Sequence, residues 1–299
     1  MPGGVDIAVA ADRPAGGPGE LSSSAGSPVR LRRRWLHNRS LVAGGTILIV
    51  FAIAGACAPL VAGHNPLAQD AAPLANPSWH HLLGTDQLGR DVWARLVYSI
   101  RIDLSVALGA VALPFIAGTA IGLLAGYFGT AVDALVMRIG EIVLAFPFNV
   151  LVLALVFVMG SGVVSVLVAF TVTGWISYTI IVRGQVLTER HQEYVLAAQL
   201  LGYSRRRILL RHVLPNVVTQ AIVYAMSDVV LTTASIVALG FLGLGITPPT
   251  PEWGSMISDG TPFLTTHPVL AAAPGVAVVI VGFGLSLIGD GLADLMRIE

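Results

Sequence analysis

Five side chains of the kind that bind metal ions lie close together in the sequence between residues 64 and 91. They are imidazoles and carboxylates: His64, His80, His81, Asp86 and Asp91. This mixture of ligands suits a divalent transition metal such as nickel. Neighbouring histidines on a loop point apart more often than they chelate one ion. The favoured interpretation is therefore a polar cap, anchored by a turn of Asp86, Arg90 and Asp91, and no metal ligand is assigned.

Other residues with catalytic potential are sparse. Ser161 lies between two glycines, but no histidine accompanies it within an apolar segment, so a membrane protease is disfavoured. All 17 basic residues are arginine. A phosphate-binding Gly-x-x-x-x-Gly-Lys-Ser/Thr loop needs lysine and is therefore excluded. We expect no catalytic residue and no cofactor on this chain.

One carboxylate, Asp228, lies near the middle of a long apolar segment. A charge at that depth costs about 2.5–3.5 kcal/mol on insertion scales, so the side chain should face protein or water. We expect Asp228 to face a translocation path or a polar partner helix. The alternative is a structural hydrogen bond to a neighbouring serine or threonine.

The amino-acid composition indicates that long apolar segments make up much of the chain. Of the 299 residues, 55% are hydrophobic and only 11% are charged, and the mean hydropathy is +0.80. Soluble domains carry about 25% charged residues. A membrane helix needs roughly 20 mainly apolar residues. Six segments meet this requirement and predict an all-α polytopic membrane protein: 41–62, 104–125, 134–159, 163–182, 217–239 and 269–288.

The arginines predict the orientation of the chain. If both termini are cytoplasmic, 14 arginines lie on the inner face and only Arg90, Arg95 and Arg101 lie outside. This agrees with the positive-inside rule. The predicted organisation begins with a disordered cytoplasmic tail with a basic flank (1–40), followed by a first membrane helix (41–62) and an extracytoplasmic segment (63–102). The remainder is a core (103–296) that contains a long inner loop (183–215).

Two smaller patterns concern helix contacts. Three glycines at four-residue spacing share one helix face, which allows close packing in lipid or a moving seam: Gly118, Gly122 and Gly126. Three charged residues lie at the expected inner end of one helix: Asp133, Arg138 and Glu141. We expect them to form a cluster at the membrane interface, in which Arg138 and Glu141 can pair because they are three residues apart.

The inner loop 183–215 contains six of the 17 arginines. Residues 193–201 favour a helix, and Gly202 follows as a candidate helix cap. Ser204 can cap a second short helix over 205–212, and Pro215 would end that unit and can open the apolar segment 217–239. Ala197 and Ala198 form a small-residue face. This predicted helix–turn–helix is suited to docking by a cytoplasmic protein.

Here the sequence resembles the permease subunits of ABC importers. The order Ala197-Ala198, Gly202 and Leu214-Pro215 is similar to their ATPase-docking EAA loop, with Leu196 in place of the usual glutamate. Glu193-Tyr194-Val195 and residues 211–216 resemble the dipeptide, oligopeptide and nickel branch, which often lacks that glutamate.

Three further blocks resemble the C-type inner-membrane subunits of this branch. Residues 81–92 read HLLGTDQLGRDV, and 240–245 read GFLGLG, followed by Pro248-Pro249 and Glu252-Trp253-Gly254. Residues 289–292 read GDGL, with Ala293 replacing the usual arginine. The resemblance covers roughly residues 30–296.

The resemblance implies a six-helix permease that imports di- or oligopeptides across the bacterial plasma membrane. It implies a homologous second permease, two cytoplasmic ATPase subunits that hold ATP and magnesium, and an extracytoplasmic binding protein. No nucleic acid is expected as a partner. The residues expected to dock the ATPase are Glu193, Tyr194, Ala197, Ala198, Gly202, Arg207, Arg211 and His212.

Two alternatives to peptide import remain open. The same family includes nickel and glutathione importers, and the chain offers no residue pattern that separates these substrates. An ion-coupled secondary transporter would need charged residues in broken helices near the membrane centre. Asp228 alone supports that class weakly, and the docking loop would then be unexplained.

Overall fold

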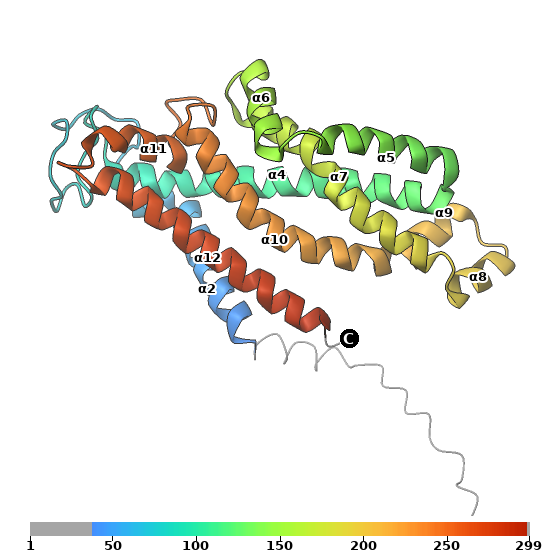
Figure 1. Ribbon diagram of the computed structural model, residues 1–299. Coiled ribbons are helices and arrows are strands. Elements are labelled where there is room, and N and C mark those ends of the chain that lie inside the picture. Colours follow the sequence, from blue (N-terminus) through green and yellow to red (C-terminus); the bar gives the residue numbers. More distant parts are fainter. Residues whose placement is uncertain (1–37, 298–299) are drawn as a thin grey trace, which may run out of the picture.

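The computed structural model describes residues 38–297 as an α-helical protein (Figure 1). The predicted tail, up to residue 37, lies outside the described residues, as do five of the arginines assigned to the inner face. Within residues 38–297 there is no strand, only an isolated bridge between Thr85 and Asp91.

Five helices are long and apolar enough to cross a membrane. The predicted apolar segments 41–62, 104–125, 163–182, 217–239 and 269–288 all fall largely within them. The five are α2, α4, α7, a continuous helical run that ends with α10, and α12: Arg39–Ala56, Val92–Phe128, Val163–Glu189, Arg205–Phe241 and Val269–Arg297.

The predicted segment 134–159 is not one straight helix. It is divided into α5 (Thr130–Leu144) and α6 (Phe148–Met159), whose axes differ by 86°. Pro147 lies at the break with an extended ψ of 128°. Proline lacks an amide hydrogen and disfavours helical geometry in the residue before it, here Phe146. Within residues 38–297 there are therefore five candidate membrane spans, or six if this bent pair is one span.

The central contact of the bundle joins α4 and α7, which run parallel to each other. A Cβ added at Gly118 would touch the Trp175 carbonyl, and one at Gly122 would lie 2.7 Å from the Thr179 carbonyl. Gly126 likewise faces Val186. The three glycines therefore provide close backbone packing, as their spacing indicated. Parallel helices need a return crossing, which α5 and α6 supply between them.

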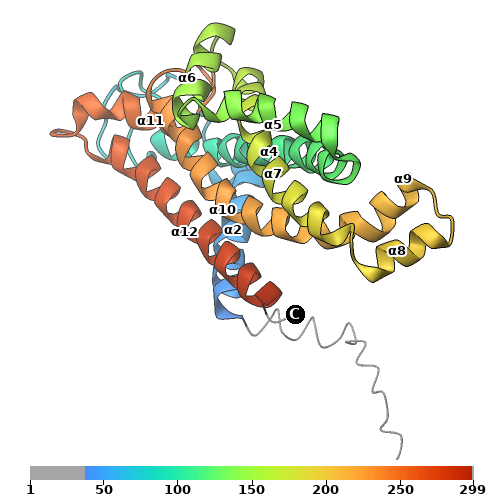
Figure 2. The same ribbon diagram turned by 45° about the vertical axis from the view of Figure 1, so that its right-hand side comes forward.

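The first and last helices, α2 and α12, pack side by side in opposite directions (Figure 2). The Asn38 amide donates a hydrogen bond of 3.2 Å to the Gly291 carbonyl, and Asn38 also caps α2 by accepting from Ser40 and Leu41. Gly284 allows close contact because its added Cβ would lie 2.9 Å from Ile47. The start of α2 and the end of α12 consequently lie on the same side of the bundle.

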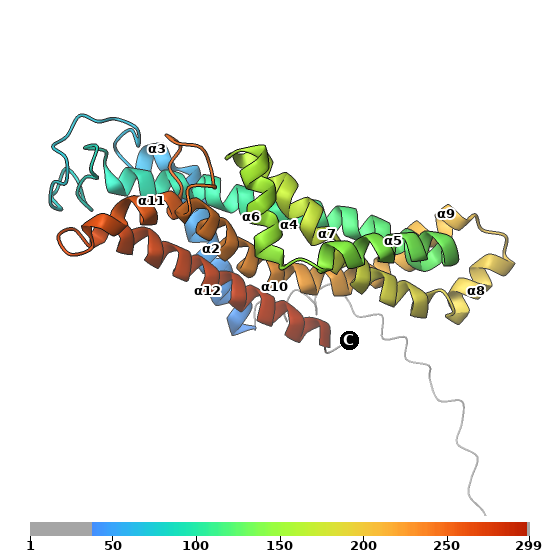
Figure 3. The same cartoon turned by 45° about the horizontal axis from the view of Figure 1, so that its top comes forward.

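The long connection 63–91 forms a cap at one end of the bundle beside α11 (Trp253–Gly260), as Figure 3 shows. Its polar turn contains the expected pair of Asp86 and Arg90, whereas the Asp91 carboxylate contacts His81 and caps α4 instead. Asp86 accepts from the Arg90 backbone at 3.0 Å and from the Arg90 guanidinium at 2.6 Å. Arg95 lies 3.7 Å from Asp86, and Arg90 lies 3.6 Å from Asp259 near the end of α11. Two short elements complete the cap, α3 (Ala58–Val61) and the 3₁₀ helix η2 (Thr261–Phe263).

The opposite end of the bundle carries a helical hairpin between α7 and α10. It consists of α8 (Glu193–Leu200), α9 (Arg205–Ile208) and the π-helical segment η1 (Leu209–Val213), which continues into α10 (Leu214–Phe241). Figure 1 shows α8 and α9 at the end of the molecule away from α11.

Candidate functional site: a helical hairpin and a cavity

The turn of the hairpin is built by Gly202 and Ser204. Gly202 has a φ of +74°, where a side chain is strained, and its amide donates to the Gln199 carbonyl at 3.0 Å. The next amide, of Tyr203, donates to the Ala198 carbonyl at 3.1 Å. Ser204 then caps α9 by accepting from the Arg207 amide at 3.4 Å. These contacts confirm the predicted helix end, turn and cap.

The prediction that Pro215 ends the short unit and opens the next membrane segment is confirmed in part, because α10 begins at Leu214 with Pro215 in its first turn, but no break separates the two helices. The chain is helical without interruption over Arg205–Phe241, so α9 leads through η1 into α10. Proline cannot donate the hydrogen bond that an α-helix requires at its position. The π-helical segment directly before Pro215 changes the local hydrogen-bond pattern, and proline is tolerated in the first turn of the α-helix that follows.

The eight residues expected to dock an ATPase do not all lie on the surface. Ala198 is only 4% exposed and packs in the core with Val195 and Ile208, so it cannot belong to an exposed face with Ala197. Consecutive helical residues point about 100° apart, which separates the two alanines. His212 is half-buried. Six residues are exposed: Glu193, Tyr194, Ala197, Gly202, Arg207 and Arg211.

Tyr203 organises the inner side of the hairpin, although the sequence did not single it out. The Arg207 guanidinium lies 4.1 Å from the centre of its ring, and the His212 ring stacks on it at 5.9 Å. A cation over an aromatic face is attracted to the ring. Arg207 and His212 therefore hold the hairpin together rather than acting only as surface charges.

Tyr194 joins the hairpin to the helices on either side of it. Its hydroxyl donates to the Glu189 carboxylate at the end of α7 and accepts from the Asn216 amide at 2.8 Å. Burial raises the pKa of Tyr194, and the hydrogen bond to Glu189 raises it further. The hydroxyl thus remains protonated and connects α7, α8 and α10.

The tip of the hairpin presents two large apolar side chains. Leu200 is 90% exposed and Leu201 is 72% exposed, next to the turn at Gly202. The sequence analysis missed both as docking candidates, although two leucines directly before a helix-ending glycine are a visible signal. An exposed apolar tip surrounded by arginines is typical of a protein interaction site.

Asp228 lies in the wall of a cavity of about 630 Å³. The Tyr178 hydroxyl on α7 donates a hydrogen bond of 2.7 Å to its carboxylate. The side chain therefore faces both a cavity and a polar partner helix. The other polar side chains in the wall are Asn149, Thr173, Ser177, Tyr224, Thr232 and Ser235.

The charged residues of α5 form two separate pairs. Arg138 and Glu141 make the expected pair at 3.0 Å on an exposed face. Asp133 does not join them; it accepts from both sides of the Arg183 guanidinium, with the second contact at 2.7 Å. The Asp133–Arg183 pair links α5 to the end of α7, close to where the hairpin begins.

Comparison with known proteins agrees with this arrangement. Residues 118–297 match the family described as binding-protein-dependent transport system inner membrane component. A dipeptide transport system permease protein of Alkalihalophilus pseudofirmus is 36% identical over 93% of this chain and 92% of its own length. An oligopeptide permease protein of Bacillus subtilis is 34% identical over 88% and 87%. A nickel permease protein of Escherichia coli is 33% identical over 88% and 94%. The chain belongs to the family of binding-protein-dependent transport system inner membrane components.

Proposed function

We propose that this chain is the C-type permease subunit of an ABC importer for di- or oligopeptides in the bacterial plasma membrane. Its similarity to dipeptide and oligopeptide transport permeases over most of the chain supports the substrate class. Nickel or glutathione import is the alternative, because permeases with those names are also similar to it.

The hairpin is the proposed docking site for a cytoplasmic ATPase, which would hold ATP and magnesium. The observation that carries this proposal is the exposed apolar tip, Leu200 and Leu201, held by a left-handed glycine and flanked by Arg205, Arg206 and Arg207. Since α7 enters the hairpin and α10 leaves it, movement of the tip would reach both helices. Glu193, Tyr194, Ala197 and Arg211 extend the proposed contact along the exposed side.

The proposed orientation places the hairpin and both chain termini in the cytoplasm. The arginine distribution supports it. The contact between Asn38 and Gly291 keeps the start of α2 and the end of α12 on one side of the bundle. The end of α4 lies beside the end of α7, just before the hairpin, because Arg190 donates to the Gly126 carbonyl at 3.0 Å.

A homologous second permease is the proposed partner at the open side of the cavity. The bent pair α5 and α6 carries large apolar side chains that the chain itself leaves exposed: Leu135, Ile139, Ile142, Val150, Phe157 and Val158. The cavity wall includes residues from this pair and Asp228 from α10. We place Asp228 on the translocation path between the two permeases, with a binding protein delivering the solute from outside.

The test is reconstitution of the chain with its second permease, ATPases and binding protein in lipid vesicles. Peptide-loaded binding protein should stimulate ATP hydrolysis, and labelled dipeptide should enter the vesicles. Uptake of nickel but not of dipeptide would favour the nickel alternative. If the binding protein does not stimulate ATP hydrolysis, and uptake of the solute depends on an ion gradient instead, the result would favour a secondary transporter.

A further inference from the structure

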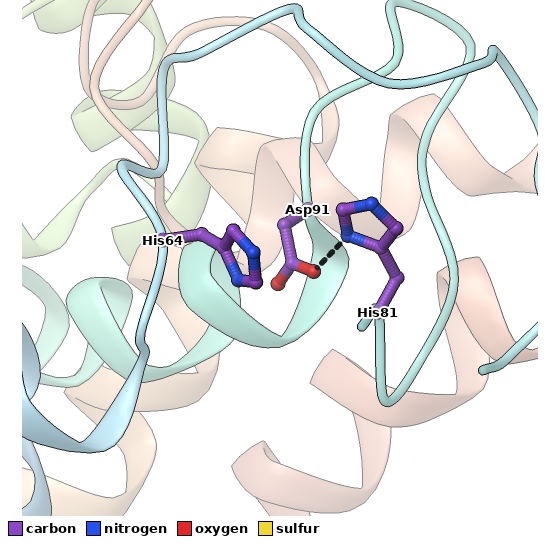
Figure 4. A group of neighbouring side chains, drawn as sticks. All are labelled: His64, His81 and Asp91. Atoms are coloured by element: carbon purple, nitrogen blue, oxygen red, sulfur yellow. Dashed lines mark hydrogen bonds and ion pairs between the residues drawn. The ribbon is translucent and has the colours of Figure 1, made fainter. Parts of the chain in front are cut away.

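Three of the five metal-binding side chains in the outer cap converge on one point. His64, His81 and Asp91 each present a ligand atom, and these atoms lie within 4.8 Å of one another. Figure 4 shows the two imidazole rings on either side of the Asp91 carboxylate. The ring centres are 5.2 Å apart. His80, next to His81 in the sequence, does not take part.

The three side chains come from separate segments, of which those of His81 and Asp91 are held by hydrogen bonds. Asp91 is the N-cap of α4 and accepts from the Ala94 amide at 2.6 Å through one oxygen, which leaves the other for His81 at 2.7 Å. The His81 carbonyl accepts from Ser78 and Gly84 in a tight turn. His64 follows Gly63, whose φ is +70°. The backbone around His81 and Asp91 thus sets the positions of these two ligands, and the exposed His64 ring lies beside them.

The charge around the cluster favours a cation. Asp91 is 4% exposed, and its carboxylate pairs with an imidazole rather than with an arginine. The two nearby arginines are matched instead by other carboxylates, Arg90 by Asp86 and Asp259 and Arg95 by Asp86. When both imidazoles are neutral, the three side chains together carry one negative charge, and this charge favours a bound cation.

We propose that His64, His81 and Asp91 form a binding site for a divalent transition metal ion, zinc or nickel. Two imidazoles and one carboxylate suit these ions, whereas magnesium and calcium require oxygen ligands. Three protein ligands leave coordination positions for water. The ion would join the segment after α3, the turn at His81 and the start of α4, and so stabilise the outer cap. This site is independent of the proposed substrate.

The experiment uses the full-length chain, purified in detergent with an affinity tag that contains no histidine. Zinc chloride and nickel chloride are titrated separately, and bound metal is measured by mass spectrometry after dialysis. Cobalt absorption spectra report the ligand set. We expect saturable binding and a rise in melting temperature with zinc or nickel, and neither effect with magnesium.

His64→Ala is the sharpest variant because His64 is exposed, and we expect it to lower metal affinity at least roughly tenfold. Asp91→Asn keeps an oxygen for capping α4 and should lower affinity as well. His80→Ala is the matched control and should bind as the wild type does. The proposal is overturned if the wild type binds neither zinc nor nickel, or if His64→Ala binds as tightly as His80→Ala.

Discussion

The Tyr178 hydroxyl donates a hydrogen bond of 2.7 Å to the Asp228 carboxylate and so joins α7 to α10 across 50 residues of sequence. These are the helices on either side of the hairpin. Tyr178 is fully buried, whereas Asp228 lies in the cavity wall. The contact therefore joins the two helices that flank the proposed docking hairpin at the wall of the cavity.

Two substitutions separate the structural role of this contact from a role in transport. Tyr178→Phe should lower the stability of the permease by about 1 kcal/mol, because the partly buried Asp228 carboxylate loses a hydrogen-bond donor. Asp228→Asn keeps the shape of the side chain and can still accept from Tyr178. We expect it to assemble normally but to transport more slowly, as measured by peptide uptake into vesicles. Full uptake by Asp228→Asn would remove the carboxylate from the transport mechanism.

The close packing of α4 on α7 predicts that the stability of the permease depends strongly on Gly122. Gly122→Ala would place a methyl group 2.7 Å from the Thr179 carbonyl, and overpacking of this kind costs about 1–3 kcal/mol. Melting temperature in detergent should fall. Gly184→Ala, within α7, is the matched control: an added Cβ there meets nothing within 4 Å, and alanine favours the helix. Equal melting temperatures for the two variants would show that the glycine face is not close-packed in solution.

Glu252 predicts a dependence of stability on pH. Its side chain is fully buried where it caps α11, and burial raises its pKa from 4.5 to about 7. Between these two pKa values the folded state binds more protons than the unfolded state. The contribution of Glu252 to the free energy of unfolding therefore falls as the pH rises. The loss should be about 3 kcal/mol, complete a little above neutral pH.

Glu252→Gln tests this dependence, because glutamine has no charge to bury. Melting temperatures of both proteins in detergent should be compared at about pH 5 and about pH 8. The wild type should lose stability relative to Glu252→Gln as the pH rises. If the two proteins change in parallel between these pH values, Glu252 is not protonated in the folded state.

The hairpin tip predicts a partner contact that can be broken without unfolding the permease. Leu200 is 90% exposed, so Leu200→Asp removes no core packing. It should leave the amount of folded permease unchanged and sharply reduce the amount of ATPase that co-purifies with it. Leu67→Asp, on the outer cap, is a control at another exposed leucine. Equal recovery of ATPase with both variants would place the docking contact elsewhere.

The hydropathy pattern predicted the helices well because lipid requires long apolar segments regardless of tertiary contacts. It missed the break at Pro147, since the apolar run continues through it, and roughly the first three turns of α4, since Arg95 and Asp103 make that part look like a loop. The turn at Gly202 was predicted instead from helix propensity and from the preference of glycine for the position after a helix end.

Contacts between distant segments could not be predicted in the same way. Asp228 was recognised as costly to bury, but its partner Tyr178 lies on another helix, and no spacing rule relates the two. The outer histidines were seen as a group, yet only the folded loops decide that His81 turns toward Asp91 and His80 does not. Asp133 likewise pairs with Arg183 rather than with the charges nearest to it in sequence.

The most direct test of ATPase docking through the hairpin is ATP hydrolysis by the reconstituted transporter, stimulated by peptide-loaded binding protein. Gly202→Val forces a branched side chain into a left-handed turn with open space around it, at a cost of about 1–2 kcal/mol. Gly243→Val imposes the same strain at the other end of α10, where φ is +76°. We predict that stimulated hydrolysis is lost in Gly202→Val and retained in Gly243→Val. Normal stimulation in Gly202→Val would contradict docking through this hairpin.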